Sequence, residues 1–262
     1  MLNKVKIMGI LNITPDSFYD GRGSISLSEN KKKIEEIKNA DIIDVGCESS
    51  RPGAKPISSD LEIERLDTII PLIEDYPDKI FSIDTCKYEV ASYALNNGFT
   101  IVNDITAGLN SSKTFSLVAN SNSKIVLMHM QGDPETMQLN PRYDSIMDTI
   151  TAFFEERIEA ATKQGIKEEN IILDPGVGFG KKIVDNDIIV RNIRQIKKMG
   201  FKVLVGISRK SFLQYNNDTP SDRLSATLGV TALLVNSGID IIRVHDVDQT
   251  ISMLNSVERI VG

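Results

Sequence analysis

Residues Ile171–Ile207, IILDPGVGFGKKIVDNDIIVRNIRQIKKMGFKVLVGI, contain a strand, a helix and a second strand in immediate succession. The apolar runs at Ile171–Asp174 and Lys202–Ile207 are short and nearly continuous, which is typical of parallel strands buried on both faces. Between them, Asn186–Met199 predicts a helix, and Gly200 is the residue type that commonly ends one. This order predicts a parallel βαβ unit.

The same unit repeats along the whole chain. The predicted strands are Lys6–Leu11, Asp41–Val45, Ile80–Asp84, Thr100–Asn103, Lys124–His129, Ile171–Asp174, Lys202–Ile207 and Asp240–Val244. The predicted helices are Ser28–Asn39, Leu61–Glu74, Lys87–Asn96, Lys113–Asn120, Tyr143–Gln164, Asn186–Met199, Asp222–Asn236 and Asp248–Val261. Eight βα units in about 250 residues predict a closed (β/α)8 TIM barrel, with residues 1–262 as one domain. An open doubly wound sheet is the alternative, but no GxGxxG pattern follows the first strand.

Composition and charge exclude several classes of protein. The 262 residues include 30 Lys and Arg against 36 Asp and Glu, for a net charge of −6. This balance disfavours nucleic acid as a partner, because phosphate backbones attract basic surfaces. No apolar run approaches the ~20 residues of a membrane span, and no signal-peptide core is present. Cys47 and Cys86 match no disulfide or metal pattern. We expect a cytoplasmic protein with reduced thiols and no membrane partner.

Every predicted strand ends in a polar side chain. The carboxyl ends of barrel strands form one rim, where barrel enzymes hold their active sites. The candidate groups for binding an anion such as a diphosphate are Arg51, Lys210, Arg243 and His245. Asp84, Asn103 and Asp174 suit a flat heterocycle with N–H groups along one edge. Asn12 offers a neutral oxygen for Mg²⁺, which usually takes one or two protein oxygens together with substrate phosphates.

Other features have two interpretations. Asp174–Lys181 (DPGVGFGK) is similar to a phosphate-binding glycine loop but lacks the GxxxxGK[ST] spacing, which favours a tight turn instead. Met128 and Phe179 are candidate walls for a ring, although Met in a barrel more often fills the core. The basic run Lys31–Lys33 is expected to be a solvated helix face.

The rim motifs resemble those of a known family. They are Ile10–Phe18 (ILNITPDSF), Asp44–Gly53 (DVGCESSRPG), Asp174–Lys181, Ser208–Ser211 (SRKS) and Arg243–Asp246 (RVHD). In this order, from the first strand to the last, they resemble the signatures of the dihydropteroate synthase family.

This resemblance implies a (β/α)8 enzyme of folate biosynthesis. The reaction would join 6-hydroxymethyl-7,8-dihydropterin diphosphate to 4-aminobenzoate, giving 7,8-dihydropteroate and diphosphate. The resemblance also implies Mg²⁺, a homodimer and competition by sulfonamides. By position, Asp84, Asn103, Asp174 and Lys210 would hold the pterin, with Met128 and Phe179 beside it. Arg51, Arg243 and His245 would hold the diphosphate, and Asn12 the Mg²⁺. Ser50, Phe18, Pro52 and Ser211 would border the aminobenzoate pocket. Arg51, Lys210 and Asp16 would form the catalytic set.

Two residues depart from the family pattern. Cys47 replaces a usual glycine, and Ser50 replaces a usual threonine but keeps its hydroxyl.

Two other functions remain as alternatives. A pterin-binding, methyltetrahydrofolate-dependent methyltransferase that works with a corrinoid protein would need no diphosphate clamp. A non-catalytic pterin-binding protein would be expected to lose some of the rim cations. The retained cations therefore favour the synthase.

Overall fold

Eight parallel strands close into a barrel in the order of the sequence. A computed structural model describes residues 5–14, 27–50, 53–215 and 218–261. The strands are β1 (Lys6–Asn12), β2 (Ile42–Gly46), β3 (Ile80–Asp84), β4 (Ile101–Asp104), β5 (Lys124–Met128), β6 (Ile171–Asp174), β7 (Lys202–Val205) and β8 (Ile241–Val244). Each strand pairs with the next, and β8 pairs in parallel with β1. The predicted (β/α)8 barrel is confirmed, and the open sheet is wrong.

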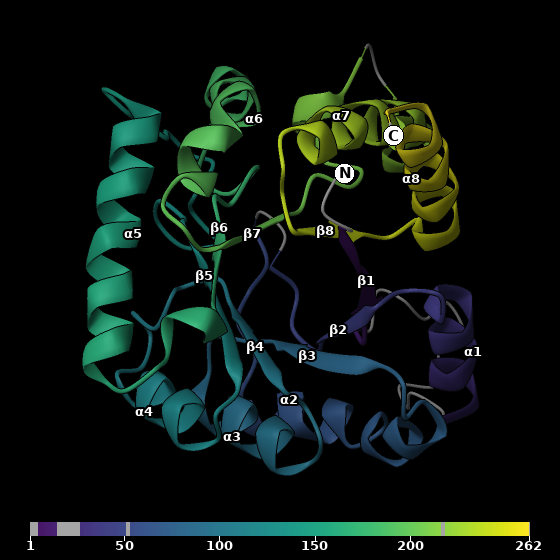
Figure 1. Cartoon of the computed structure of the whole chain (residues 1–262). Helices are drawn as coiled ribbons and strands as arrows, with labels where there is room; N and C mark the ends of the chain where they lie inside the picture. The colour runs from purple at the N-terminus through teal and green to yellow at the C-terminus, as the bar shows by residue number, and fades with distance from the viewer. Residues whose placement is uncertain (1–4, 15–26, 51–52, 216–217, 262) are drawn as a thin grey trace.

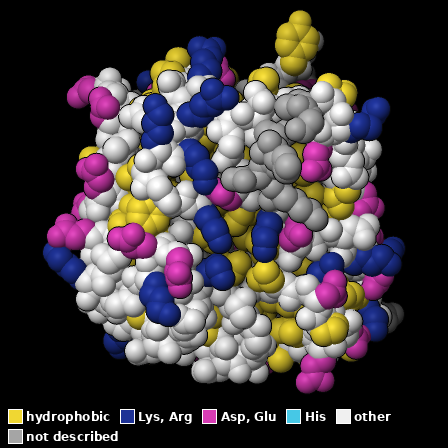
Figure 2. Space-filling view, viewed as in Figure 1, with side chains coloured by type: hydrophobic (Ala, Val, Ile, Leu, Met, Phe, Trp, Pro, Cys, Tyr) yellow, Lys and Arg dark blue, Asp and Glu magenta, His cyan; other side chains and the backbone are white. Residues whose placement is uncertain are grey.

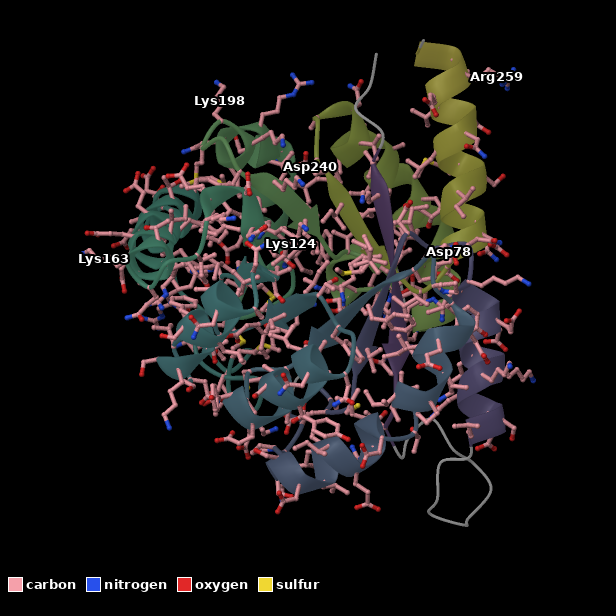
Figure 3. The ribbon with its side chains drawn as sticks, turned by 60° about the horizontal axis from the view of Figure 1, so that its bottom comes forward. Asp78, Lys124, Lys163, Lys198, Asp240 and Arg259 are labelled. Atoms are coloured by element: carbon pink, nitrogen blue, oxygen red, sulfur yellow. The ribbon has the colours of Figure 1, made fainter. Side chains whose placement is uncertain are left out.

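The α-helices surround this barrel (Figure 1). They are α1 (Leu27–Ile37), α2 (Ser59–Leu66), α3 (Tyr88–Asn96), α4 (Lys113–Asn120), α5 (Ile146–Lys163), α6 (Ile183–Lys197), α7 (Leu224–Asn236) and α8 (Val247–Val261). Short 3-10 helices are η2 (Ile70–Asp75), η3 (Glu168–Asn170), η4 (Ser211–Leu213) and η5 (Pro220–Arg223). Lys163 and Arg259, on α5 and α8, lie at the outer edge, whereas Lys124 and Asp240, at strand starts, lie nearer the middle (Figure 3).

One predicted helix divides into two elements. Residues 61–74 were expected to form a single helix, but α2 ends at Leu66 and η2 begins at Ile70. The second residue of η2 is Pro71. Proline has no N–H for the helical ladder, its ring clashes with the preceding turn, and it disfavours helical backbone at the residue before it. The α-helix therefore ends before Pro71.

The barrel interior is an apolar layer separate from the core under the helices. Successive side chains of a strand point to opposite faces. The interior layer consists of Met8, Ile42, Ile101, Val126, Ile172, Leu204 and Ile241, with Ile80 packed against it. Their neighbours, such as Ile43, Phe81 and Leu127, belong to the larger core between strands and helices. Residues two and four positions beyond the interior layer consequently face the barrel axis as well.

The face of the molecule seen in Figure 2 mixes both signs of charge. On the face in Figure 2, Lys and Arg side chains lie among Asp, Glu and hydrophobic ones. Within the described residues, no helix is long and apolar enough to cross a membrane.

Candidate functional site

The inward-facing positions near the strand ends are mostly polar. Two positions beyond the interior layer are Asp44, Asn103, Met128, Asp174 and Arg243, and four positions beyond it are Asn12 and Asp84. The period of two directs all of them toward the barrel axis at the carboxyl ends of the strands. The structure therefore brings together residues from seven strands, and five of these residues, Asn12, Asp84, Asn103, Asp174 and Arg243, are ones that the sequence analysis placed on one rim.

Arg243 is the centre of an ion-pair network. Its Nε donates to Asp44 Oδ2 at 2.6 Å, and its Nη2 donates to Asp84 Oδ2 at 2.7 Å. Asn103 Nδ2 donates to the same Asp44 oxygen at 3.0 Å. Asp44 begins one of the motifs that resemble the family but was not among the predicted site residues. Its position two residues after Ile42, in the inward-facing series, is the signal that would have found it.

Burial shifts the pKa values of the charged groups in this site. It raises the pKa of Asp84 to about 7, although Arg243 acts to lower it. Burial also raises the pKa of Asp174, and Lys210 opposes that change. The pKa of Lys210 falls to about 8, again chiefly through burial, with Asp174 opposing. Desolvated charges interact strongly with a bound polar ligand, and such a cluster is typical of a functional site.

Lys210 reaches across the turn that follows β6. Its Nζ donates to the Val177 carbonyl oxygen and lies 4.6 Å from the centre of the Phe179 ring. In the same turn, Asp174 Oδ1 accepts the Gly176 N–H at 2.7 Å. The second oxygen of Asp174, Oδ2, has no hydrogen-bond partner within the part of the chain that the structure describes. This oxygen is available to a ligand next to an ammonium and an aromatic ring.

The glycine-rich segment after β6 is a tight turn, as predicted. Lys181 Nζ donates to the carbonyl oxygens of His129, Gly176 and Phe179 at 3.1, 2.9 and 2.9 Å. These acceptors match the three donors of one ammonium, and Lys181 is buried. Gly176 has a φ of 64°, and a Cβ there would lie 2.0 Å from the His129 carbonyl oxygen. The Lys181 ammonium therefore binds the protein's own backbone.

Strands β7 and β8 end in a second linked group. His245 Nδ1 lies 3.0 Å from Ser208 Oγ, and the His245 N–H donates to the same oxygen at 3.2 Å. Arg209 donates twice to Asp246, at 3.0 and 2.5 Å. Ser211 begins η4 on the segment after β7. These contacts tie the candidate residues of the two neighbouring strands to one another.

Ser50 and Asp84 line the same cavity, which has a volume of about 270 Å³. Its other lining residues are Glu48, Ser49, Ala54, Pro56, Thr85, Cys86, Ile105, Thr106, Asp133, Pro134 and Glu135. A second cavity, of about 260 Å³, also includes Ile105 and Thr106 and is lined by Met128 and Phe153. Met128 is thus buried in the barrel and also forms part of a cavity wall.

Cys47, a departure from the family pattern, is accommodated in the core. Its side chain is fully buried in the cluster between strands and helices. Its carbonyl oxygen accepts a hydrogen bond from Arg65 Nη1 at 2.7 Å. Burial raises the pKa of the Cys47 thiol well above its ordinary value, which leaves the thiol protonated and unreactive.

Asn12 is the last residue of β1 and lies close to Asp84. A Cβ built on Gly46 would be 3.4 Å from Asn12 Oδ1 and 3.7 Å from Asp84 Oδ2. The glycine therefore leaves room for both oxygens at one place. In the described residues, no group of three or more His, Cys, Asp or Glu side chains could hold a metal ion by itself. A single hard oxygen fits Mg²⁺ that takes most of its ligands from phosphate and water.

The basic run on α1 is only partly solvated, which corrects the expectation for Lys33. Lys33 Nζ donates to the Asn12 carbonyl oxygen at 3.3 Å, and burial lowers its pKa. Lys31, in contrast, forms an exposed ion pair with Asp75 at 2.7 Å. A periodicity argument could not reveal this, because the contact depends on how α1 packs beside β1.

Four of the predicted site residues, Asp16, Phe18, Arg51 and Pro52, lie outside the described residues.

His129, at the end of its predicted strand, is a buried residue. Its ring packs edge-on against Phe153 at 5.0 Å between centres, and burial lowers its pKa to about 3. His129 is therefore neutral at pH 7.

A barrel with buried, partly paired charges at the carboxyl ends of its strands defines an enzyme that binds a charged, hydrogen-bonding small molecule. Residues 8–245 match the family described as pterin binding enzyme. The dihydropteroate synthase of Escherichia coli (strain K12) is 38% identical over 260 residues, which cover 98% of this chain and 92% of that protein.

Solved structures agree with this match. Dihydropteroate synthase from Clostridium difficile, crystallised in the presence of pteroic acid, has a TM-score of 0.92 and 37% identity, covering 99% of this chain and 97% of that one. The Yersinia pestis dihydropteroate synthase, in complex with a sulfonamide drug, has a TM-score of 0.92 and 34% identity, covering 99% and 95%. The chain belongs to the dihydropteroate synthase family of pterin-binding enzymes, so the family resemblance of its motifs is confirmed.

Proposed function

We propose that the chain condenses 6-hydroxymethyl-7,8-dihydropterin diphosphate with 4-aminobenzoate, releasing diphosphate and 7,8-dihydropteroate. The observation that supports the proposal most is that hydrogen-bond-accepting side chains and positively charged side chains lie together at the carboxyl ends of the barrel strands. Arg243 lies 2.7 Å from Asp84, and the Asp174 carboxylate and the Lys210 ammonium shift each other's pKa. The relatives named above support the reaction, since pteroic acid contains both a pterin and an aminobenzoate unit.

The acceptor set would bind the pterin. Asp174 Oδ2 would accept from the 2-amino and N3 groups, because Oδ1 is already engaged by Gly176. Asn103 and Asp84 would bind other polar atoms of the ring. Phe179 and Met128 would flank it, and Lys210 would hold it from the β7 side. A buried site that pairs every ligand N–H discriminates strongly against rings that lack them.

The cation set would bind the diphosphate. Arg243 uses Nε and Nη2 for Asp44 and Asp84, which leaves Nη1 without a partner among the described residues. Burial acts to lower the pKa of Arg243, but the two carboxylates raise it above its usual value, so the guanidinium is charged. His245 and Arg51 would complete this set. Asn12 would hold Mg²⁺, which when bound supplies positive charge against the departing phosphate oxygens.

The reaction breaks the bond between the pterin methylene carbon and the diphosphate oxygen and forms a carbon–nitrogen bond. The electron-rich pterin stabilises a cationic methylene, and an arylamine is already a nucleophile at pH 7. Arg51, Lys210 and Asp16 form the proposed catalytic set, and Ser50, Phe18, Pro52 and Ser211 would border the aminobenzoate. After attack, the amine gives up one proton to solvent, and the diphosphate leaves with the electron pair of the broken C–O bond. Catalysis then rests on positioning and on fixed charge near the leaving group.

The decisive experiment is to incubate the purified chain with pterin diphosphate, 4-aminobenzoate and Mg²⁺. We expect stoichiometric diphosphate and dihydropteroate, with loss of both products when Mg²⁺ is chelated. A pterin-dependent methyltransferase or a non-catalytic pterin binder would bind the pterin but release no diphosphate. A sulfonamide should compete with aminobenzoate and not with the pterin.

We also propose a homodimer that forms through α7. None of the 13 residues of α7 is charged. Ser225, Gly229 and Leu233, spaced by four, are exposed on one face of this helix, and Leu233 is 63% exposed. We assign the contact to this stripe because it lacks charged side chains, which are depleted at the centres of protein–protein interfaces. A cytoplasmic location completes the proposal, since Cys47 and Cys86 are both free thiols.

A further inference from the structure

Three charged side chains form a largely buried cluster beside the site, and none of them is a candidate site residue. Lys87 connects β3 to α3, Glu62 lies in α2, and Glu48 follows β2. Lys87 Nζ lies 2.7 Å from Glu62 Oε2 and 2.9 Å from Glu48 Oε2. The side chains of Lys87, Glu62 and Glu48 are 14%, 0% and 20% exposed. One ammonium therefore joins two carboxylates from different parts of the chain.

Each member of this cluster depends on the others. Burial raises the pKa of Glu62, and Lys87 acts to lower it. Burial acts to lower the pKa of Lys87, but its hydrogen bonds to Glu62 and Glu48 raise it overall. Removing one partner would leave an uncompensated buried charge, which is costly. Because each charge must keep its partner, the cluster imposes a defined geometry on the three segments that carry it.

The Glu48 side chain also joins the two ends of segment 48–57. While Glu48 Oε2 binds Lys87, its Oε1 accepts the Ile57 N–H at 2.6 Å. Residues 48–57 carry Ser50 and, next in the sequence, Arg51. Both the start and the end of this segment are thus attached, through one carboxylate, to the Lys87 ammonium.

Lys87 also contacts the side of the site that is proposed for the pterin. Its N–H donates to Thr85 Oγ1 at 3.2 Å. Thr85 follows Asp84 directly, and both line the cavity that Glu48 and Ser50 line. The Lys87 cluster therefore connects the strand end that would hold the pterin with the segment that would serve the second substrate.

We propose that Lys87 is a positioning residue. Its ammonium, shared by Glu62 and Glu48, sets residues 48–50 and 53–57 against the end of β3, so that aminobenzoate meets Ser50 correctly. This rests on the proposed function. Lys87 touches neither substrate in this account and acts through Glu48. Its role is therefore in the step that uses segment 48–57, and the pterin contacts of Asp174 and Asn103 do not depend on it.

The test compares Lys87→Met with Lys87→Arg and Glu48→Gln. Lys87→Met should lower kcat/KM for aminobenzoate at least tenfold, while the affinity for a phosphate-free pterin, measured by calorimetry, stays within about twofold. Lys87→Arg should recover part of the loss, because it keeps a charged donor. Glu48→Gln keeps the Ile57 acceptor and the shape but weakens the link to Lys87, so it should show the same selective loss. If Lys87→Met does not fold, Glu48→Gln alone carries this comparison.

Lys79→Met is a matched control, because Lys79 has a 16% exposed side chain, precedes the start of β3 and also pairs with an acid, Asp78. Lys79→Met should leave both kcat/KM for aminobenzoate and the affinity for the phosphate-free pterin unchanged. Equal losses of pterin and aminobenzoate binding in Lys87→Met, or an unchanged kcat/KM for aminobenzoate, would overturn the proposal.

Hydrogen exchange separates this proposal from the proposed reaction. The Ile57 amide should lose protection in Lys87→Met and keep it in Lys79→Met, whether or not the wild-type chain makes dihydropteroate. A wild type without synthase activity but with this loss of protection would refute the function and retain the positioning role. Unchanged protection of Ile57 would refute the positioning role itself.

Discussion

Asp174 uses one of its two carboxylate oxygens within the protein and leaves the other for the proposed ligand. Oδ1 accepts the Gly176 N–H at 2.7 Å, and Oδ2 has no partner in the described part of the chain. In Asp174→Asn, the amide oxygen would keep the Gly176 contact, so the NH₂ group would face the ligand. A donor would then meet the donors of the pterin edge. This arrangement makes the effect of the substitution specific to ligands with N–H groups.

We therefore predict that Asp174→Asn lowers pterin affinity at least about tenfold, since leaving a buried group unpaired costs ~1–3 kcal/mol. Isothermal calorimetry with a phosphate-free pterin measures this directly. The denaturation midpoint should change much less than the affinity, because the Gly176 hydrogen bond survives. Pterin binding equal to that of the wild type would contradict the assignment.

The raised pKa of Asp84 predicts that pterin binding depends on pH. Its pKa in the ligand-free protein is about 7, raised chiefly by burial. A ligand N–H that donates to Asp84 favours the ionised carboxylate, so binding lowers this pKa. Below pH 7 the complex must release a proton to form. Affinity should then be greatest between this pKa and the pKa of Lys210, about 8, and fall, by up to about tenfold per pH unit, as the pH drops below 7.

The measurement is calorimetry with 6-hydroxymethylpterin, which carries no phosphate that titrates in this range. Titrations at pH 6 in two buffers of different ionisation enthalpy should reveal the released proton. Asp84→Asn should bind more weakly but lose most of the pH dependence. Wild-type affinity that is constant from pH 6 to 8 would contradict the prediction.

At the scale of elements, the turn after β7 stores backbone strain. Arg209 has a φ of 59°, in the left-handed region that non-glycine residues rarely adopt. Its side chain donates twice to Asp246, and its carbonyl oxygen accepts from Arg223 Nη1 at 3.0 Å. These contacts hold the conformation of the residue directly before Lys210. The strain therefore lies next to a proposed catalytic group, where strained residues are often found.

We predict that Arg209→Gly is more stable than Arg209→Ala by about 1 kcal/mol, since the left-handed conformation costs a residue with a Cβ ~1–2 kcal/mol. Both variants lose the ion pair with Asp246. The difference between their free energies of unfolding therefore reports the cost of the left-handed backbone conformation alone. Urea denaturation measures it. The same pair of substitutions at Glu155, exposed within α5, should give the opposite order, with glycine about 1 kcal/mol less stable. The same order at both positions would refute the prediction.

At the scale of the whole molecule, α7 determines the proposed assembly. Its exposed stripe of Ser225, Gly229 and Leu233 has no charged side chain to keep it in water. We predict that Leu233→Lys converts a dimer into monomers, because two like charges would face each other across a symmetric contact. Sedimentation velocity over a range of concentrations measures the change. Ile183→Lys, at a position with 62% exposure on α6, is the matched control and should remain dimeric. A wild type that is monomeric throughout would refute the homodimer.

The sequence by itself determined the barrel and most of its rim. Local patterns sufficed, since strands and helices follow from short-range periodicity, and a parallel order with eight units leaves few topologies. The strand ends then predicted Asn12, Asp84, Asn103, Asp174 and Arg243 on one rim. The sequence-based prediction missed the break before Pro71, although proline disrupts a helix through its own ring and its missing N–H, so this signal was local.

Only the tertiary structure decided which charges pair. Arg243 meets Asp44 across 199 positions of sequence, because closing the barrel brings β8 round beside β1 and the inward residues of β2. Lys181 binds three backbone carbonyls although its motif is similar to a phosphate loop. Lys87 finds both of its carboxylates on other elements. Such partners depend on how separate elements pack, and buried charges take the partners that packing provides, which no local pattern encodes.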